Sequence, residues 1–151
     1  MSVVLNNSAK ELAYSEGINR VVATAIKISL NVIHHKYKEA SEMIKILSLL
    51  PNGLESEMMQ KLFPQGGRWK ENVRRLINHS LVQCIEKAGC RYYLAHPQII
   101  TEVEGEIGTE EKIRLHERVC AELVQRINKI YKFVGTSSQY SQRAQELFLT
   151  E

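Results

Sequence analysis

The sequence predicts a mainly helical protein with one short β-hairpin. Along most of the 151 residues the apolar side chains recur at steps of three and four, which is the period of an amphipathic helix. Between residues 81 and 96 the spacing changes to a strand-like pattern around Lys87-Ala88-Gly89, which predicts a hairpin turn. Hydrophobic residues make up 44% of the chain and charged residues 25%, proportions typical of a globular protein with an apolar core.

Three short helices are expected before the hairpin. Residues 40–50 carry an apolar stripe at helical spacing, and Pro51-Asn52-Gly53 ends it with three helix-breaking residues in succession. A second helix is expected over residues 54–63, where a proline and two glycines follow. A third helix begins at Trp69 or one residue before it and ends near His79.

Longer helices are expected on both sides of this segment. Residues 9–33 have helical spacing, and Gly17 within them predicts two helices or a frayed start. After the hairpin, a helix is expected from Pro97 to about residue 103. A capping signature at Thr109-Glu110-Glu111 then opens a long amphipathic helix, and Gly135 predicts its end and the start of a second helix, giving a C-terminal helical hairpin. The stripe of the long helix comprises Ile113, His116, Val119, Cys120, Leu123, Ile127, Ile130 and Val134.

Three short helices followed by a β-hairpin is the element order of a winged-helix domain. We expect this domain to span residues 37–105, with a three-helix core and the hairpin as its wing. Residues 1–36 are then a helical lead-in. Residues 106–151 are a helical arm or the start of a helical repeat.

The third short helix would be the recognition helix of such a domain, and it carries Arg68, Lys70, Arg74 and Arg75. In a winged-helix DNA-binding regulator these residues would neutralise phosphates. At helical spacing, however, Lys70 and Arg74 share one face, whereas Arg68 and Arg75 share another. The net charge of +3 and the pI near 8.8 are modest for a nucleic-acid-binding domain. These observations favour a solvated face or a contact with another protein domain.

Trp69 at the start of this helix has two interpretations. The favoured one is a large anchor that fills the joint between the second and third short helices. The alternative is stacking on a nucleic-acid base.

The sequence lacks the patterns typical of metal sites, nucleotide sites and catalytic triads. The cysteines Cys84, Cys90 and Cys120 do not have metal-ligand spacing, and no histidine belongs to a motif such as H-E-x-x-H. The glycine-rich segment "PQGGRWK" neither follows a strand nor contains the Lys-Ser/Thr pair of a phosphate-binding loop. We therefore expect no metal, no bound cofactor and no enzymatic activity in this chain.

Cysteine usage favours a cytoplasmic location. An odd number of cysteines without a spacing pattern is typical of small apolar residues in a reducing compartment. A disulfide or a two-cysteine metal site formed by Cys84 and Cys90 across the hairpin is the alternative. No apolar run approaches 18 residues and no charged-then-apolar leader is present, so neither a membrane span nor a signal peptide is expected.

Several motifs resemble a known family, in the same order along the chain. They are "LSLLPNGL" at residues 47–54, Trp69, Leu76 with "SLV" at residues 80–82, and "RYYLAHP" at residues 91–97. Together they resemble the region after the nucleotide-binding core of signal-transduction ATPases with numerous domains, the STAND class, which includes NB-ARC and related regulators. The resemblance covers about half of the chain and implies the winged-helix domain of such a protein.

The resemblance also implies a role for His96. In that class the corresponding histidine reaches the β-phosphate of bound ADP and holds the protein in its closed, inactive state. The chain would then pack against its own NTPase core, which binds ADP or ATP, and against a downstream sensor. His96 should lie at the surface and have no partner of its own in this chain. The "MHD" form of the motif has an aspartate where Pro97 stands here, so the contacts of that aspartate do not carry over.

Two alternatives from other functional classes remain open at this point. One is the winged-helix DNA-binding regulator that uses the four basic residues of the third helix. The other is a protein-interaction or oligomerisation module, in which the long amphipathic helix over residues 109–134 docks a partner or a second copy.

Overall fold

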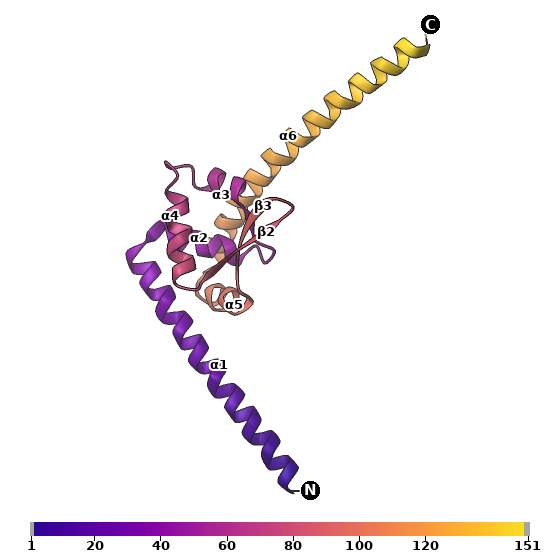
Figure 1. Ribbon diagram of the computed structural model, residues 1–151. Coiled ribbons are helices and arrows are strands. Elements are labelled where there is room, and N and C mark those ends of the chain that lie inside the picture. The colour runs from indigo at the N-terminus through magenta and orange to yellow at the C-terminus, as the bar shows by residue number, and fades with distance from the viewer. Residues whose placement is uncertain (1, 150–151) are drawn as a thin grey trace.

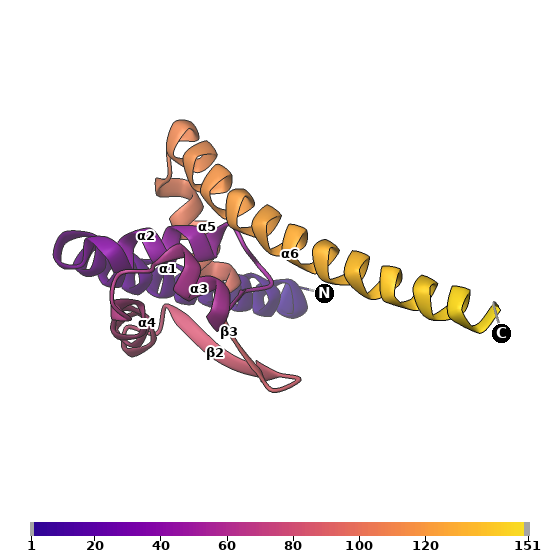
Figure 2. The ribbon, with the colours of Figure 1, turned by 90° about the horizontal axis from the view of Figure 1, so that it is seen from above.

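In the computed structural model of this protein the backbone of residues 2–149 and the side chains of residues 9–134 are described. These residues form a mainly helical structure with a small antiparallel sheet (Figure 1). The elements are α1 (Ser2–Lys36), α2 (Lys38–Ser48), β1 (Leu54–Glu55), α3 (Ser56–Leu62), α4 (Arg68–Asn78), β2 (Val82–Lys87), β3 (Cys90–Ala95), α5 (Pro97–Glu106) and α6 (Thr109–Leu149). The elements from α2 to α5 form a compact body, from which α1 and α6 project in different directions (Figures 1 and 2).

Helix α2 lies at the centre of the body because its apolar stripe is buried on several sides. Met43, Ile44 and Leu47 are fully buried, and α2 packs against α1, α4 and α5. The chain then turns through Gly53, whose φ of +84° favours glycine. A Cβ atom at this position would lie 2.8 Å from the carbonyl oxygen of Tyr93, so the turn and the close approach of β3 both require glycine.

The sheet has the strand order β1-β3-β2, and both pairings are antiparallel. The predicted hairpin is confirmed: β2 and β3 are joined by Ala88 and Gly89, which have φ values of +51° and +78°, the left-handed conformation that tight hairpin turns need. Successive side chains of β3 point to opposite faces of the sheet. Tyr93 faces α4 and makes an edge-on contact with the ring of Trp69, whereas Cys90 lies on the opposite face.

Three predicted boundaries were wrong. Leu54 and Glu55 pair with β3, so the second short helix starts only at Ser56. Helix α1 continues through Gly17 without a break, and α6 continues through Gly135 to Leu149. The predicted C-terminal helical hairpin is therefore a single long helix. One glycine costs a helix only about 1 kcal/mol relative to alanine, which is too little to end a helix that is favourable on both sides.

The two long helices join the body through limited parts of their length. Leu30 and Ile33 near the end of α1 are fully buried, and so is Leu115 in the second turn of α6, with Val119 nearly buried one turn later. Among the described helices, none is both long and apolar enough to cross a membrane.

Candidate functional site

His96 is the N-cap of α5 and directly follows the last residue of β3. Its backbone is extended, with φ −64° and ψ 147°, and Pro97 occupies the first helical position, where its missing N–H costs nothing. Nδ1 of His96 accepts a long hydrogen bond of 3.4 Å from the backbone N–H of Gln98. The His-Pro pair therefore fixes both the end of the strand and the start of the helix.

The position of His96 partly meets the expectation from the sequence. The side chain is exposed, as a contact with a ligand outside this chain requires. It does have a partner, the N–H of Gln98, which had not been expected. Because Nδ1 accepts this bond, the neutral ring carries its proton on Nε2. The Nε2–H group is thus the donor that His96 offers to a ligand.

The other backbone donors of this helix end are already in use. The N–H groups of Ile99 and Ile100 both donate to the carbonyl oxygen of His96, at 2.9 and 3.0 Å. Pro97 has no N–H. A phosphate at this end of α5 would consequently be bound by the imidazole and not by a cradle of backbone amides.

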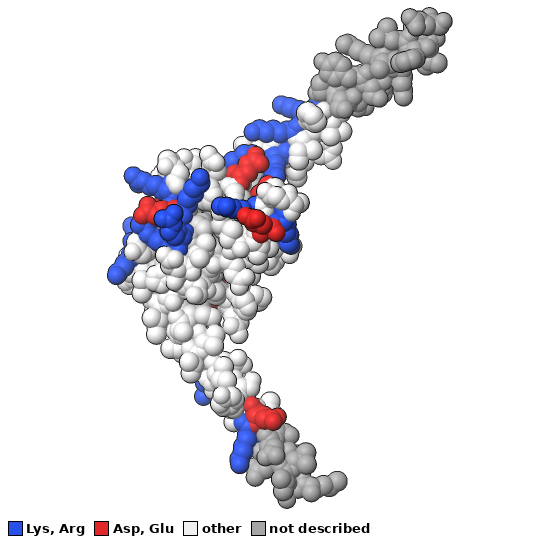
Figure 3. All heavy atoms as spheres, in the orientation of Figure 1, with Lys and Arg blue, Asp and Glu red and all other residues white. Residues whose placement is uncertain are grey.

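The basic residues of α4 divide between two concave surfaces, as their spacing predicts. Lys70 and Arg74 line a concavity of about 560 Å³, to which the hairpin adds Arg91. Arg68 and Arg75 line a separate one of about 320 Å³, next to the end of α1. Figure 3 shows basic side chains gathered on this side of the body with acidic ones among them. The four residues therefore line two different concave surfaces.

Arg75 is engaged within the fold. Its guanidinium pairs with Glu71 at 2.7 Å, donates to Oδ1 of Asn72 at 2.9 Å and lies over the ring of Tyr37, 4.3 Å from the centroid. Asn72 itself is buried and donates from Nδ2 to Glu39 at 3.0 Å. This network ties α4 to α2, and the side chains of Arg75 and Asn72 are both bonded within the body.

Trp69 is an anchor and not a stacking platform. The side chain is only 4% exposed, and its ring centroid lies 6.0 Å from that of Tyr93 with an interplanar angle of 74°. The side chain is buried, as an anchor requires, and its ring contacts Tyr93 of the hairpin. A base could not reach the face of this ring without unfolding the contact.

His34, Ser41 and Glu106 form a cluster between three helices. Nδ1 of His34 is hydrogen-bonded to the Ser41 hydroxyl, and Nε2 lies 2.9 Å from Glu106. Serine, histidine and glutamate in this order can form a catalytic triad. Here, however, Ser41 is buried inside α2 and its backbone N–H is bonded to the Tyr37 carbonyl, so the hydroxyl has neither substrate access nor its own amide as an oxyanion donor. The cluster joins α1, α2 and α5.

Glu55 and Arg126 connect the sheet to α6. Their side chains form an ion pair of 2.8 Å, and this hydrogen bond holds the pKa of Glu55 below its usual value. The neighbouring Cys90 thiol is hydrogen-bonded to the same carboxylate, which raises the pKa of Cys90. Arg126 therefore joins α6 to β1 at the edge of the sheet.

Cys84, Cys90 and Cys120 are free thiols. Cys84 lies opposite Tyr93 and Cys90 opposite Lys87, which places the two hairpin cysteines on opposite faces of the sheet. The alternative of a disulfide or shared metal between them is therefore wrong for this fold. Within the described residues, no three metal-ligand side chains converge.

Sequence reasoning missed the residues that hold the elements together. No sequence pattern singles out Asn72, and Glu55 and Arg126 are 71 positions apart. Only the capping role of His96 had a local signal, because a residue followed by proline often starts a helix.

No family model, no curated protein and no solved structure matches this chain.

Proposed function

We propose that residues 37–105 are the winged-helix regulatory module of a STAND-type NTPase, acting in the cytoplasm. The module packs against a nucleotide-binding core that this chain does not contain and holds the ADP-bound, inactive state. His96 donates from Nε2 to a phosphate oxygen of that ADP. The chain has no catalytic role of its own and relays activation to a downstream sensor.

The observation that carries the proposal is the setting of His96. An exposed imidazole, held at a strand end by Pro97 and by the bond from Gln98, presents one oriented donor. Charge-assisted hydrogen bonds to phosphate are among the stronger ones in proteins. The order of α2, α3, α4 and the β2–β3 hairpin further supports a winged-helix scaffold.

The experiment compares ADP retention by the protein that joins this chain to its NTPase core, before and after substitution of His96. His96→Asn is the informative variant, because asparagine is a good N-cap but has no imidazole Nε2–H. We expect His96→Asn to release ADP at least about tenfold faster, which corresponds to the loss of one hydrogen bond to a charged group.

Two controls separate the phosphate contact from the capping role. In the absence of nucleotide, the thermal midpoint of His96→Asn should equal that of the wild type, since the cap is kept. His35→Ala, which alters an exposed histidine on α1, should leave ADP release unchanged. Unchanged ADP release by His96→Asn would remove the proposed role of His96.

A further inference from the structure

A largely apolar seam runs along the exposed side of α6. Its members follow each other at alternating steps of three and four residues, which are the a and d positions of a heptad. We call this face the α6 seam, and it consists of Ile113, His116, Cys120, Leu123, Ile127, Ile130 and Val134. All seven side chains are exposed, and the four isoleucine and valine residues are between 49% and 55% exposed.

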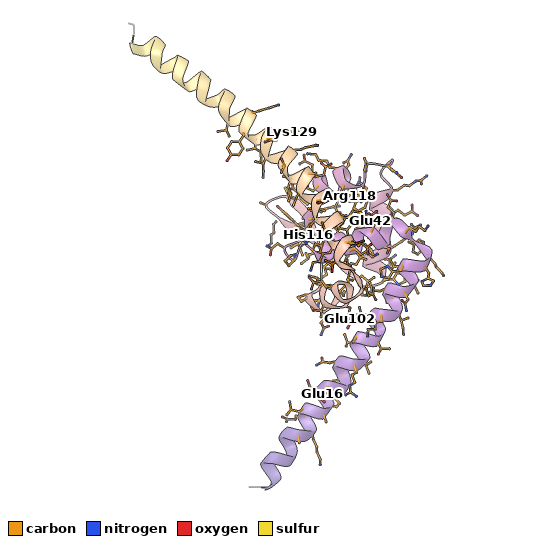
Figure 4. All side chains as sticks on the ribbon, turned by 180° about the vertical axis from the view of Figure 1, so that it is seen from behind. Glu16, Glu42, Glu102, His116, Arg118 and Lys129 are labelled. Atoms are coloured by element: carbon orange, nitrogen blue, oxygen red, sulfur yellow. The ribbon has the colours of Figure 1, made fainter. Side chains whose placement is uncertain are left out.

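The α6 seam is not the side by which α6 is attached to the body. The attachment uses the buried side chains Leu115 and Val119 and the ion pairs of Arg118 and Arg126. These four residues occupy heptad positions other than a and d. Figure 4 shows Arg118 beside Glu42 at the body, whereas Lys129 lies on the part of α6 that projects beyond it.

Large apolar side chains also flank the α6 seam on the projecting part of the helix. Val124, Tyr131 and Phe133 are 54%, 71% and 77% exposed. Single exposed apolar residues are normal on a protein surface, but a contiguous stripe of this length marks an interaction site. An apolar stripe with heptad spacing is the kind of face that packs against a second helix.

The charges along α6 indicate which helix covers the seam. From Thr109 to Glu122 the helix carries four acidic and three basic residues. From Leu123 to Val134 it carries three basic residues and no acidic one. Two copies in antiparallel orientation bring each basic half beside the more acidic half of the other copy, and also oppose the two helix dipoles. A parallel pair would place the two basic halves together.

We propose that α6 pairs with α6 of a second copy of this chain, in antiparallel orientation, through the α6 seam. In the alignment that sets a positions against d positions, Leu123 lies opposite Ile127 of the second copy, and Cys120 lies opposite Ile130. The pairing requires neither His96 nor a nucleotide, so it stands apart from the function proposed above.

The first experiment is sedimentation equilibrium of the chain at micromolar concentrations. We expect a species of twice the 17.3 kDa chain mass. Ile130→Glu should weaken the dimer about 100-fold or more, because it buries a carboxylate in an apolar seam. Asn128→Glu is the matched control: the same residue is introduced two positions away, outside the seam, and the dissociation constant should change less than about threefold. Far-UV circular dichroism should show equal helix content in all three proteins.

The second experiment determines the orientation by disulfide cross-linking. In a background with Cys84→Ser and Cys90→Ser, Ile130→Cys is oxidised with oxidised glutathione. Antiparallel pairing should yield a covalent dimer whose peptides link position 130 to Cys120. Three results would overturn the proposal: a monomer at every concentration, a Cys120–Cys120 link as the main product, or dissociation by Ile28→Glu on α1 but not by Ile130→Glu.

Discussion

Asn72 offers a direct test of the hydrogen bonds that join α4 to α2. We consider Asn72→Ala, which removes a buried carboxamide but leaves the helix intact. The carboxamide makes two hydrogen bonds, one to Glu39 at 3.0 Å and one from Arg75 at 2.9 Å. Both partners are charged, for which a single hydrogen bond contributes about 1.5–3 kcal/mol. Glu39 and Arg75 are also only partly buried, so water can hydrate them in the variant. The lower end of this energy range therefore applies. We expect a loss of about 2–3 kcal/mol in the free energy of unfolding.

The assay is urea unfolding followed by the fluorescence of Trp69, the only tryptophan of the chain. The midpoint should fall while the slope m stays the same, because the surface exposed on unfolding hardly changes. Asn78→Ala alters an exposed asparagine at the end of the same helix and should change the free energy by less than about 0.5 kcal/mol.

A double-mutant cycle adds a second requirement. If the contact between Asn72 and Glu39 is real, Asn72→Ala combined with Glu39→Gln should cost less than the sum of the two single changes, by about 0.5–1 kcal/mol. Should Asn72→Ala destabilise the protein by less than 0.5 kcal/mol, or should the two changes be additive, the proposed network between α2 and α4 would be refuted.

Two further predictions concern the connections of the sheet. The lowered pKa of Glu55 means that its pairing with Arg126 stabilises the fold above pH 4.5, the usual pKa, and that this stabilisation disappears as the pH falls through the lowered value. Arg126→Gln should therefore cost about 1 kcal/mol at pH 7 and progressively less as the pH falls through the lowered pKa of Glu55. A cost in urea unfolding that does not decrease at acidic pH would contradict the pairing. Gly53→Ala should lower the free energy of unfolding by more than about 2 kcal/mol, because alanine is strained at this φ and its Cβ would meet the Tyr93 carbonyl. Gly66 has a similar φ of +62° but open space around it, so Gly66→Ala should cost only about 1 kcal/mol. Equal costs for Gly53→Ala and Gly66→Ala would show that the close approach of Gly53 to the Tyr93 carbonyl is absent.

Local signals in the sequence predicted the features that depend on neighbouring residues. Gly89 indicated the hairpin turn, because glycine adopts a positive φ without strain, whereas the positive φ of Ala88 has no signal in its residue type. The division of the basic residues of α4 into two pairs followed from helical spacing alone, and the two concave surfaces confirm it. Pro97 correctly placed the start of α5.

Other features depend on contacts between distant segments, and the sequence could not reveal them. The short strand β1 exists because residues 54 and 55 meet β3, about 38 positions later, and this pairing overrides their helical pattern. The ion pair between Glu55 and Arg126 joins residues 71 positions apart, so no local pattern indicates it. Gly135 is the opposite case: a single unfavourable residue predicts a break, but the favourable helical residues on either side outweigh it.

The projecting part of α6 has a mechanical consequence. From Arg126 to Leu149 the helix extends about 35 Å at 1.5 Å per residue. A tilt of about 10° where Arg126 meets Glu55 would move the far end by about 6 Å, which is more than one helical turn. A small rotation of α6 at its ion pair with the edge strand β1 would thus become a much larger displacement at the far end of the helix.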